Sequence, residues 1–384
     1  MYRFQIVDSM FDTVTISLNG TNINKNSGKY AYRSYITKLL SYPEAAKMSW
    51  MQSEGWYEDT VAKYDPSQYA VDTTGFKQRR ELFMIRQENE KDPEKYSDRY
   101  IQMFGKIYSD LNTMSCGVLP GISIDVKMEF APDKFRICSK AGSDYKIEIN
   151  KMVLHMPLGA VNPNLYRAIE HKLAKEACRV FYTRFELQHF TINRGSQTFN
   201  QIINTSTASG ASRMMIFFLT LGQFDGRFDL NPYEFSRRWG VKVGEGTEAR
   251  MEYFYVKKVE LSVNGRPLDC INGDATEHDD PVSFLRMNQI LGNMARPTGN
   301  GMEYRKWVNC CAIFMFDLTV TGRSGQTSDV MSPIVKTGDT RIDVTFGGKP
   351  TLEEMKVVVL QEFPSLFTIS KGRTLNFSYF SAVN

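Results

Sequence analysis

The 384-residue chain lacks most of the residue patterns on which catalytic and metal sites depend. It has only four histidines, and none stands in an H-E-x-x-H or H-x-x-x-H pattern: His155, His171, His189 and His278. Its six cysteines include no C-x-x-C pair, which excludes a zinc ribbon and a thioredoxin-type motif. No G-x-S-x-G elbow or P-loop is present, which argues against a hydrolase of that type and a Walker-type nucleotide site.

Long apolar runs and strong charge are also missing. The longest apolar run, 214–221, has the length of a strand, so we expect no membrane span. The first residues contain no run that fits a signal peptide, so we expect a protein that is not secreted by that route and whose thiols stay reduced. The formal net charge is +4, too weak a bias to indicate nucleic-acid binding without a concentrated basic patch.

The acidic cluster at 277–280, E-H-D-D, is the most ligand-like stretch in the chain. It lacks the alternating oxygen donors and the glycine turn of an EF-hand loop. We expect a solvated acidic loop there, and we predict no catalytic residue, no cofactor and no metal for the chain as a whole.

What the sequence does contain is a succession of strands. Alternation of apolar and polar residues with period two, punctuated by Gly, Asn, Asp and Pro, predicts strands in the segments 12–20, 121–132, 145–159, 184–192, 212–222, 259–265, 309–322, 339–348 and 355–363. Adjacent residues of a strand point to opposite faces, so we expect Cys310 and Cys311 to point apart. Helices are predicted from Tyr30 to just before Pro43 and from Asn164 onward, while the charged segment 76–96 reads as a solvated excursion.

Two of the predicted strands repeat one pattern. V-T-I-S-L-N-G at 14–20 matches V-E-L-S-V-N-G at 259–265, and each ends in an Asn-Gly turn, Asn19-Gly20 and Asn264-Gly265. Asn and Gly tolerate the positive φ values that such turns require.

The same order of elements follows both copies. Each is followed by a short helix, then by Met-Ser and an Ile-Asp-Val strand (124–126 and 342–344), and then by an alternating strand that opens on lysine. Strands with one buried face must pack against a second sheet, so the repeat predicts two β-sandwich barrels in tandem. We place the first at 1–163 and the second at 164–384, and the first looks short of its opening strands.

The 309–322 strand supplies a specific prediction about the core of the second barrel. Phe314, Phe316 and Leu318 should face the core, with Met315 and Asp317 on the other face. If Asp317 is buried, its carboxylate needs a hydrogen-bond partner.

At this point the motifs resemble a known family. The order of L-N-G at 18–20, Y-A-Y-R-S-Y-I-T-K-L-L-S-Y at 30–42, N-P-Y-E-F at 231–235, F-M-F-D-L-T at 314–319, G-D-T-R-I-D-V-T-F at 338–346 and V-V-V-L-Q-E-F at 357–363 is similar to that of double jelly-roll major capsid proteins of eukaryotic DNA viruses. The likeness is greatest to the capsid-like proteins of Polinton (Maverick)-type, adintovirus-like elements in animal genomes. It covers nearly the whole chain from Val14 onward. Family members carry further strands before the first Asn-Gly strand, and this sequence departs from them there.

The resemblance implies an all-β double jelly roll of two eight-stranded barrels with short helices in its loops. It implies a non-enzymatic capsid subunit that forms homotrimers and pseudo-hexagonal capsomers in an icosahedral virion, with a penton or minor capsid protein as partner. Of the basic pairs Arg79-Arg80 and Arg237-Arg238, the first is a candidate for weak contact with packaged DNA. Two other readings stay open: a minor capsid or penton protein, and a non-viral β-sandwich binding protein.

Overall fold

The computed structural model describes residues 6–24, 28–58, 75, 78–79, 101–114, 116–137, 146–203, 211–227, 230–244, 250–263, 265–272, 276–295, 299–319 and 339–378. Its strands are β1 (Phe11–Leu18), β2 (Thr21–Asn22), β3 (Ile124–Phe130), β4 (Cys178–Ile192), β5 (Thr198–Ile203), β6 (Arg213–Thr220), β7 (Arg238–Val243), β8 (Arg250–Val263), β9 (Arg266–Asn272), β10 (Phe314–Asp317), β11 (Thr340–Gly348), β12 (Met355–Ile369) and β13 (Leu375–Ser378). Its helices are α1 (Ile6–Ser9), α2 (Tyr30–Ser41), α3 (Glu44–Lys47), α5 (Asp133–Arg136), α6 (Pro163–Lys175), α7 (Leu221–Phe224), α8 (Pro281–Ile290) and α9 (Tyr304–Cys310), with 3-10 turns η1 (Trp50–Glu54), η5 (Asp110–Thr113) and η7 (Asn293–Ala295). The predicted helices at α2 and α6 are confirmed.

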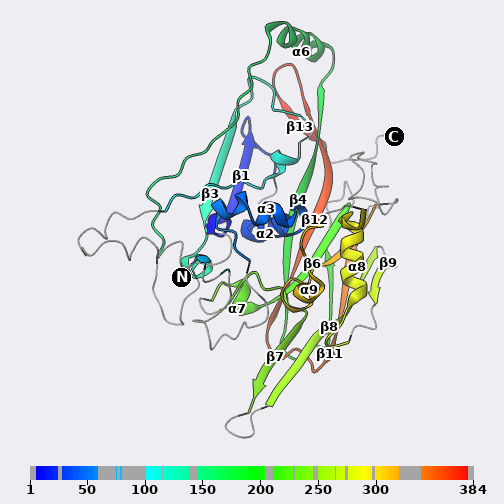
Figure 1. Ribbon diagram of the computed structural model, residues 1–384. Coiled ribbons are helices and arrows are strands. Elements are labelled where there is room, and N and C mark those ends of the chain that lie inside the picture. The colour runs from blue at the N-terminus through cyan, green and yellow to red at the C-terminus, as the bar shows by residue number, and fades with distance from the viewer. Residues whose placement is uncertain are drawn as a thin grey trace, which may run out of the picture.

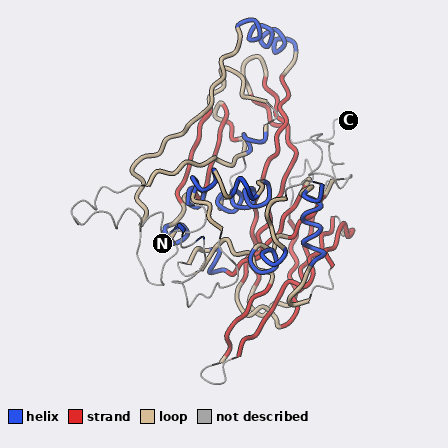
Figure 2. The backbone as a smooth tube through the Cα atoms, viewed as in Figure 1, coloured by secondary structure: helices blue, strands red, loops and turns tan. Residues whose placement is uncertain are grey.

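The strand order of the second half is that of a jelly roll. One sheet has the order β10-β6-β12-β4, and the other has the order β5-β11-β8-β9. The first and last of these strands in the chain, β4 and β12, pair in one sheet. The second and next-to-last, β5 and β11, pair in the other sheet, and this nested pairing is that of a jelly roll. Figure 2 shows these strands in the lower part of the molecule, from which β4 and β12 continue into the upper part.

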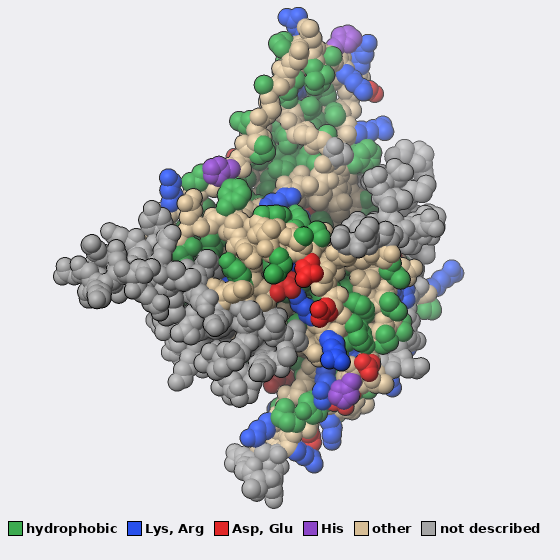
Figure 3. Space-filling model, viewed as in Figure 1, with side chains coloured by type: hydrophobic (Ala, Val, Ile, Leu, Met, Phe, Trp, Pro, Cys, Tyr) green, Lys and Arg blue, Asp and Glu red, His purple; other side chains and the backbone are tan. Residues whose placement is uncertain are grey.

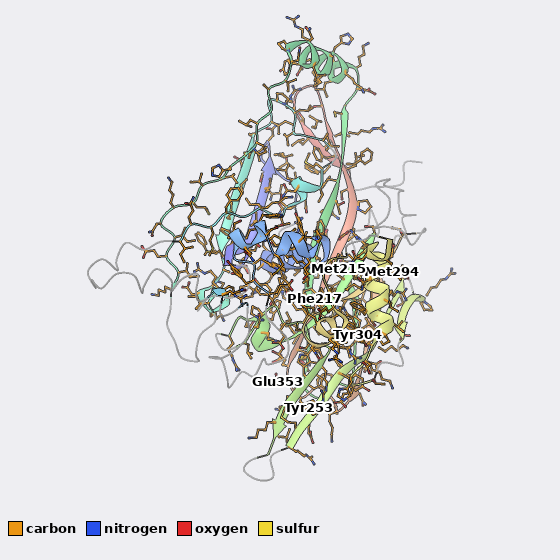
Figure 4. The ribbon with its side chains drawn as sticks, in the orientation of Figure 1. Met215, Phe217, Tyr253, Met294, Tyr304 and Glu353 are labelled. Atoms are coloured by element: carbon orange, nitrogen blue, oxygen red, sulfur yellow. The ribbon has the colours of Figure 1, made fainter. Side chains whose placement is uncertain are left out.

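The lower core lies between these two sheets. Phe218 on β6 points across to Phe346 on β11, with ring centroids 6.2 Å apart. Its neighbour Phe217 points the other way and meets Tyr32 of α2 at 5.9 Å. The run 214–219 is buried on both faces because a sheet covers one side and a helix the other, which explains its lack of polar alternation. Figure 4 labels Phe217 and Met215 where the two halves of the chain meet.

The repeat in the sequence is a repeat in space. The hairpin of β1 and β2 corresponds to the hairpin of β8 and β9, and in each copy the following Ile-Asp-Val strand pairs antiparallel with the first strand. The sheet order is β2-β1-β3 in one copy and β9-β8-β11 in the other. The registers differ by two residues, since Ile124 lies opposite Leu18 whereas Ile342 lies opposite Leu261. A shift of two keeps the same side chains on the core face.

The first Asn-Gly turn has the conformation that its residues favour. Asn19 and Gly20 have φ values of 46° and 77°, as a type I′ hairpin requires. The Asn19 side chain also accepts a hydrogen bond from the Ser123 amide at 2.7 Å and donates to the Arg373 carbonyl at 2.9 Å. In the second copy Gly265 has a φ of 71°, and Asn264 lies outside the described residues.

The two longest strands, β4 and β12, take part in both halves of the molecule. They pair with each other over their whole length, from Met355 opposite Ile192 to Ile369 opposite Cys178. On its other edge β12 pairs first with β6 and then with β13. The upper ends of β4 and β12 thus form, with β13, a short sheet that faces β2-β1-β3, as Figure 1 shows.

A second, upper core fills the space between these short sheets. It contains buried side chains from both halves of the sequence: Val14, Ile16, Leu18, Ile23, Tyr30, Tyr108, Val180, Tyr182, Phe367, Ile369 and Leu375. The all-β architecture of two tandem sandwich units with short connecting helices is confirmed. The boundary expected between residues 163 and 164 stays a prediction, although the strands of the second segment clearly contribute to both cores.

Pro364 marks the point where β12 passes from one core to the other. Proline has no N–H to give to a ladder, so it is tolerated in a sheet only where a partner is missing. Strand β6 begins opposite Glu362 and β13 ends opposite Leu366, which leaves Pro364 without a strand neighbour on that edge.

Two strand predictions were wrong. Residues 146–162 form no ladder with any described strand, although their sequence alternates like a strand. The segment 309–322 begins with the end of α9, and only β10 within it is a described strand.

The side chains of β10 are buried on both faces. Phe314 and Phe316 lie in the lower core, but Met315 is buried as well, because it lies opposite Met215 on the face that Phe217 presents to Tyr32 of α2. Leu318 lies just beyond the strand and is half-buried. Asp317 is half-buried and accepts hydrogen bonds from the Thr319 amide at 2.9 Å and from the Thr319 hydroxyl at 2.6 Å.

The two cores should respond separately to cavities. Phe367 packs between Tyr182 and Phe377 in the upper core, with ring centroids 5.6 and 5.3 Å away, so Phe367→Ala should cost about 3–5 kcal/mol locally. Amide hydrogen exchange should then speed up in β1 and β3 more than in β8 and β11. The matched variant Phe316→Ala, in the lower core, should give the reverse pattern; equal loss in both sheets from either variant would contradict two separable cores.

Candidate functional site

The acidic residues of the 277–280 cluster form hydrogen bonds and ion pairs within the protein. Asp280 caps α8, accepting from the amide of Ser283 at 3.1 Å and from its hydroxyl at 2.7 Å, while Arg237 lies 3.9 Å from the same carboxylate. Glu277 pairs with Arg238 at 2.6 Å. Within the described ranges no group of three or more His, Cys, Asp or Glu could hold a metal ion.

The histidines lie in four separate environments. His171 and His278 are exposed, and His155 contacts the ring of Phe104. His189 lies against Phe224, with ring centroids 4.8 Å apart. Its pKa is lowered because the site is partly desolvated and Lys356 and Lys29 are near. The four are not brought together.

The basic pairs do not form a described surface patch. Arg79 is only 2% exposed and donates to the Tyr57 carbonyl, so it is not a surface cation, and Arg80 lies outside the described residues. Arg237 is fully buried, and Arg238 stacks on Tyr253 with its guanidinium 3.7 Å from the ring centroid.

The most unusual surface feature is an extended segment, residues 146–162, which we call the arm. It runs along one side of the upper core to α6 at the top of the molecule in Figure 1. Large apolar side chains on the arm and the start of α6 are exposed, and Figure 3 shows apolar surface over this part of the molecule. The exposed apolar residues are Met152, Val153, Leu154, Met156, Leu158, Val161, Leu165 and Tyr166.

The backbone of the arm makes few hydrogen bonds to the described residues. Among the hydrogen bonds between described residues, none involves the backbone of residues 148–161. The arm is held at its two ends. The Ile147 amide donates to Asp133 at 3.4 Å, and the Asn162 side chain caps α6.

The repeat explains why the arm looks like a strand. Its sequence corresponds to β12, which in the second copy is flanked on both edges by other strands. The place opposite β2-β1-β3 that such a strand would fill is occupied by the upper ends of β4 and β12. The arm therefore has strand-forming sequence, exposed apolar side chains and no described strand beside it, which is the state of an unprotected sheet element.

A second notable region is the junction where α2, from the first half, packs on the lower core. The Lys38 ammonium is fully buried and pairs with the carboxylates of Asp8 and Glu54. Burial raises the pKa of Glu54, and the Lys38 charge offsets part of that rise. Lys47 is also buried and donates to the Leu39 carbonyl at 2.8 Å and to the Asn300 carbonyl at 2.6 Å. Desolvation lowers the pKa of Lys47 to about 8.

Buried charges also mark the level at which the two cores meet. Arg184 and Glu186 on β4 pair at 3.1 Å, and Arg213, the first residue of β6, pairs with Glu362 at 2.6 Å. Because Arg213 and Glu362 lie on neighbouring strands, a slip of β6 along β12 would separate them and leave the buried Glu362 carboxylate without its partner.

Comparison with known proteins gives structural similarity only. No protein-family model and no curated protein matches the sequence. Solved structures that resemble the chain include PBCV-1 VP54, in a structure that fits it into a reconstruction of the virophage Sputnik, with 8% identity over 98% of this chain and 85% of that one and a TM-score of 0.46. The mavirus major capsid protein has 8% identity over 99% of this chain and 79% of that one, with a TM-score of 0.38. The Faustovirus major capsid protein has 7% identity over 95% and 72%, with a TM-score of 0.43.

Sequence reasoning did not identify the arm as an exposed surface. The signal was the run M-V-L-H-M-P-L at 152–158. This run has too many apolar residues in succession for a half-buried strand, in which apolar and polar residues alternate. No described helix is long and apolar enough to cross a membrane.

Lys47 should give the junction a distinct pH dependence. Its folded pKa of about 8 lies below the ordinary lysine pKa of 10.5, so the unfolded chain binds more protons between these pH values and stability rises with pH across that window. Relative to Lys47→Met, the wild type should gain up to about 1.4 kcal/mol of unfolding free energy per pH unit there.

Denaturant melts at several pH values between 7 and 10.5 would measure this difference. Lys127→Met, which removes an exposed lysine, is the control and should track the wild type. A wild-type advantage over Lys47→Met that stays constant with pH would show that Lys47 ionises normally.

Proposed function

We propose that this protein is a major capsid subunit, which forms homotrimers that serve as pseudo-hexagonal capsomers of an icosahedral virion. The single observation that carries the proposal is the repetition of one sandwich plan within a chain, with the second copy in jelly-roll strand order. Three chains of two barrels each give six similar units around a threefold axis, which suits hexagonal tiling.

The shape of the shared ladder supports this role. Strands β4 and β12 run through both cores, so the two units are joined by fifteen paired residues on each strand and not by a linker alone. A tile in a shell must keep the angle between its units, and a continuous sheet resists bending at that point more strongly than a loop does.

The arm is the surface through which we expect one copy to contact the next. Leu158 is 90% exposed, and covering a side chain of this kind contributes about 1.5–3 kcal/mol. The arm and the start of α6 present eight such side chains along one side, together with unpaired backbone groups. A second copy of the chain could cover the side chains and supply the missing strand contacts at once.

The finer assignments rest on the sequence motifs. The order of motifs from Leu18 to Phe363 supports a Polinton-type or adintovirus-like origin. Lateral contacts between capsomers, a penton or minor capsid protein as a further partner, and weak contact with packaged DNA belong to the same proposal. A minor capsid protein of one barrel would not need the internal repeat, which favours the major subunit over that alternative.

Leu158→Asp tests the assembly surface. The wild type should have a solution mass three times that of the 44.0 kDa chain, and the variant should be monomeric, because a carboxylate cannot be buried unpaired in an apolar contact. Light scattering after size-exclusion chromatography measures both.

Met294→Asp is the matched control, since Met294 is an exposed apolar residue away from the arm and should leave the trimer intact. Unchanged circular dichroism would show that Leu158→Asp still folds. A wild type that is a stable monomer would contradict the proposed function, whereas a trimer unaffected by Leu158→Asp would contradict only the role of the arm.

A further inference from the structure

Two neighbouring cysteines lie with their sulfur atoms close together at the junction of the two halves. Cys310 is the last residue of α9, Cys311 follows it, and their Sγ atoms are 3.5 Å apart. The expectation that these side chains point apart was wrong because the backbone here ends a helix instead of continuing a strand.

The backbone around this pair is held in place. The Phe235 amide donates to the Cys310 carbonyl at 2.7 Å, and the Ala312 amide donates to the Phe235 carbonyl at the same distance. Cys311 is 1% exposed, whereas Cys310 is half-buried. One sulfur is therefore partly accessible from solvent, and the other lies directly behind it.

Charged and polar groups surround the two sulfur atoms. Lys306 lies one helical turn before Cys310, whose Sγ is 3.5 Å from the Lys306 carbonyl, and the Lys306 ammonium pairs with Glu58. The hydrogen bond from Cys310 lowers the pKa of Cys311, helped by the Lys306 charge and Tyr35 and opposed by burial. The same hydrogen bond raises the pKa of Cys310, and burial adds to that rise.

The pair thus has the geometry of a hydrogen-bonded dithiol, in which one sulfur lies in contact with the other. A thiolate is the reactive form of cysteine, and a neighbouring thiol can resolve its oxidised product. By contrast, Cys116 is exposed, and among the described cysteines only Cys310 and Cys311 are within sulfur–sulfur contact.

We propose that Cys310 and Cys311 form a reversible oxidative modification site, at which a peroxide converts the two thiols into a disulfide between adjacent residues. The Cys310 sulfur, on the more exposed residue, attacks one peroxide oxygen as its proton passes to the Cys311 thiolate, the O–O bond breaks, and the leaving hydroxide takes a proton from solvent, which gives a sulfenic acid on Cys310 and one water. The Cys311 sulfur then attacks the Cys310 sulfur, the S–O bond breaks, and the second water leaves with the Cys311 proton. Two thiols are oxidised and one hydrogen peroxide is reduced to two waters.

The position of the site gives the modification a structural consequence. The ring that closes on oxidation includes the 310–311 peptide group, whose carbonyl accepts the bond from Phe235. Phe235 in turn packs against Tyr35 of α2, with ring centroids 5.6 Å apart. Oxidation would therefore act on the contact between α2 and the lower core, independently of the arm and of the proposed capsid function.

Peptide mass spectrometry of the full chain tests the proposal. The protein is treated with hydrogen peroxide, denatured, alkylated with N-ethylmaleimide and digested with trypsin, and the peptide 307–323 contains both cysteines. We expect this peptide to lose two hydrogen atoms and gain no alkyl group, and to recover both alkylation sites after reduction with dithiothreitol.

Single substitutions separate the two roles. Cys311→Ser should stop at a sulfenic acid on Cys310 that dimedone traps, and Cys116→Ser should leave the result unchanged. Phenylarsine oxide, which bridges two close thiols, should protect both sites in the untreated wild type, and this test needs no variant. Full alkylation of both cysteines after peroxide, or stepwise oxidation of each to a sulfinic acid without loss of two hydrogens, would overturn the proposal.

Discussion

The structure depends on the antiparallel ladder between β4 and β12. These strands pair from end to end, and each half of the ladder is one wall of a different core. The register of a ladder is selected by which side chains must be buried, and β4 and β12 bury side chains in both cores, so the ladder fixes how the upper core sits on the lower core. Proline at position 364 and the paired charges of Arg184, Glu186, Arg213 and Glu362 mark the transition between the two cores.

This shared ladder changes how the internal repeat is used. The first copy keeps the hairpin, the helix and the Ile-Asp-Val strand, and its three-stranded sheet packs on strands that belong to the second copy. The segment that corresponds to β12 is left outside as the arm. A single arrangement therefore accounts for both the rigid connection between the units and the exposed apolar surface on one side of the molecule.

Most of the fold could be predicted from the sequence because most strands are marked by local patterns of residues. Period-two alternation and Asn-Gly turns located β1, β8 and β11, and helical spacing located α2 and α6. The failures concern tertiary partners. Residues 146–162 alternate like a strand but have no described strand neighbour. Met315 is buried on a face that a two-layer sandwich would leave exposed, because this face, shared with Met215 and Phe217, packs toward α2. Cys310 and Cys311 approach each other because α9 ends at Cys310. Sequence propensities do not locate the end of a helix to within one residue.

We propose that copies of this double jelly roll join around a threefold axis. Electron microscopy of the purified protein, with two-dimensional class averages of single particles, tests it most directly. The account predicts particles of three chains with a six-sided outline, in which each chain contributes two neighbouring lobes. Class averages that show isolated two-lobed monomers, or rings with fivefold symmetry, would contradict it.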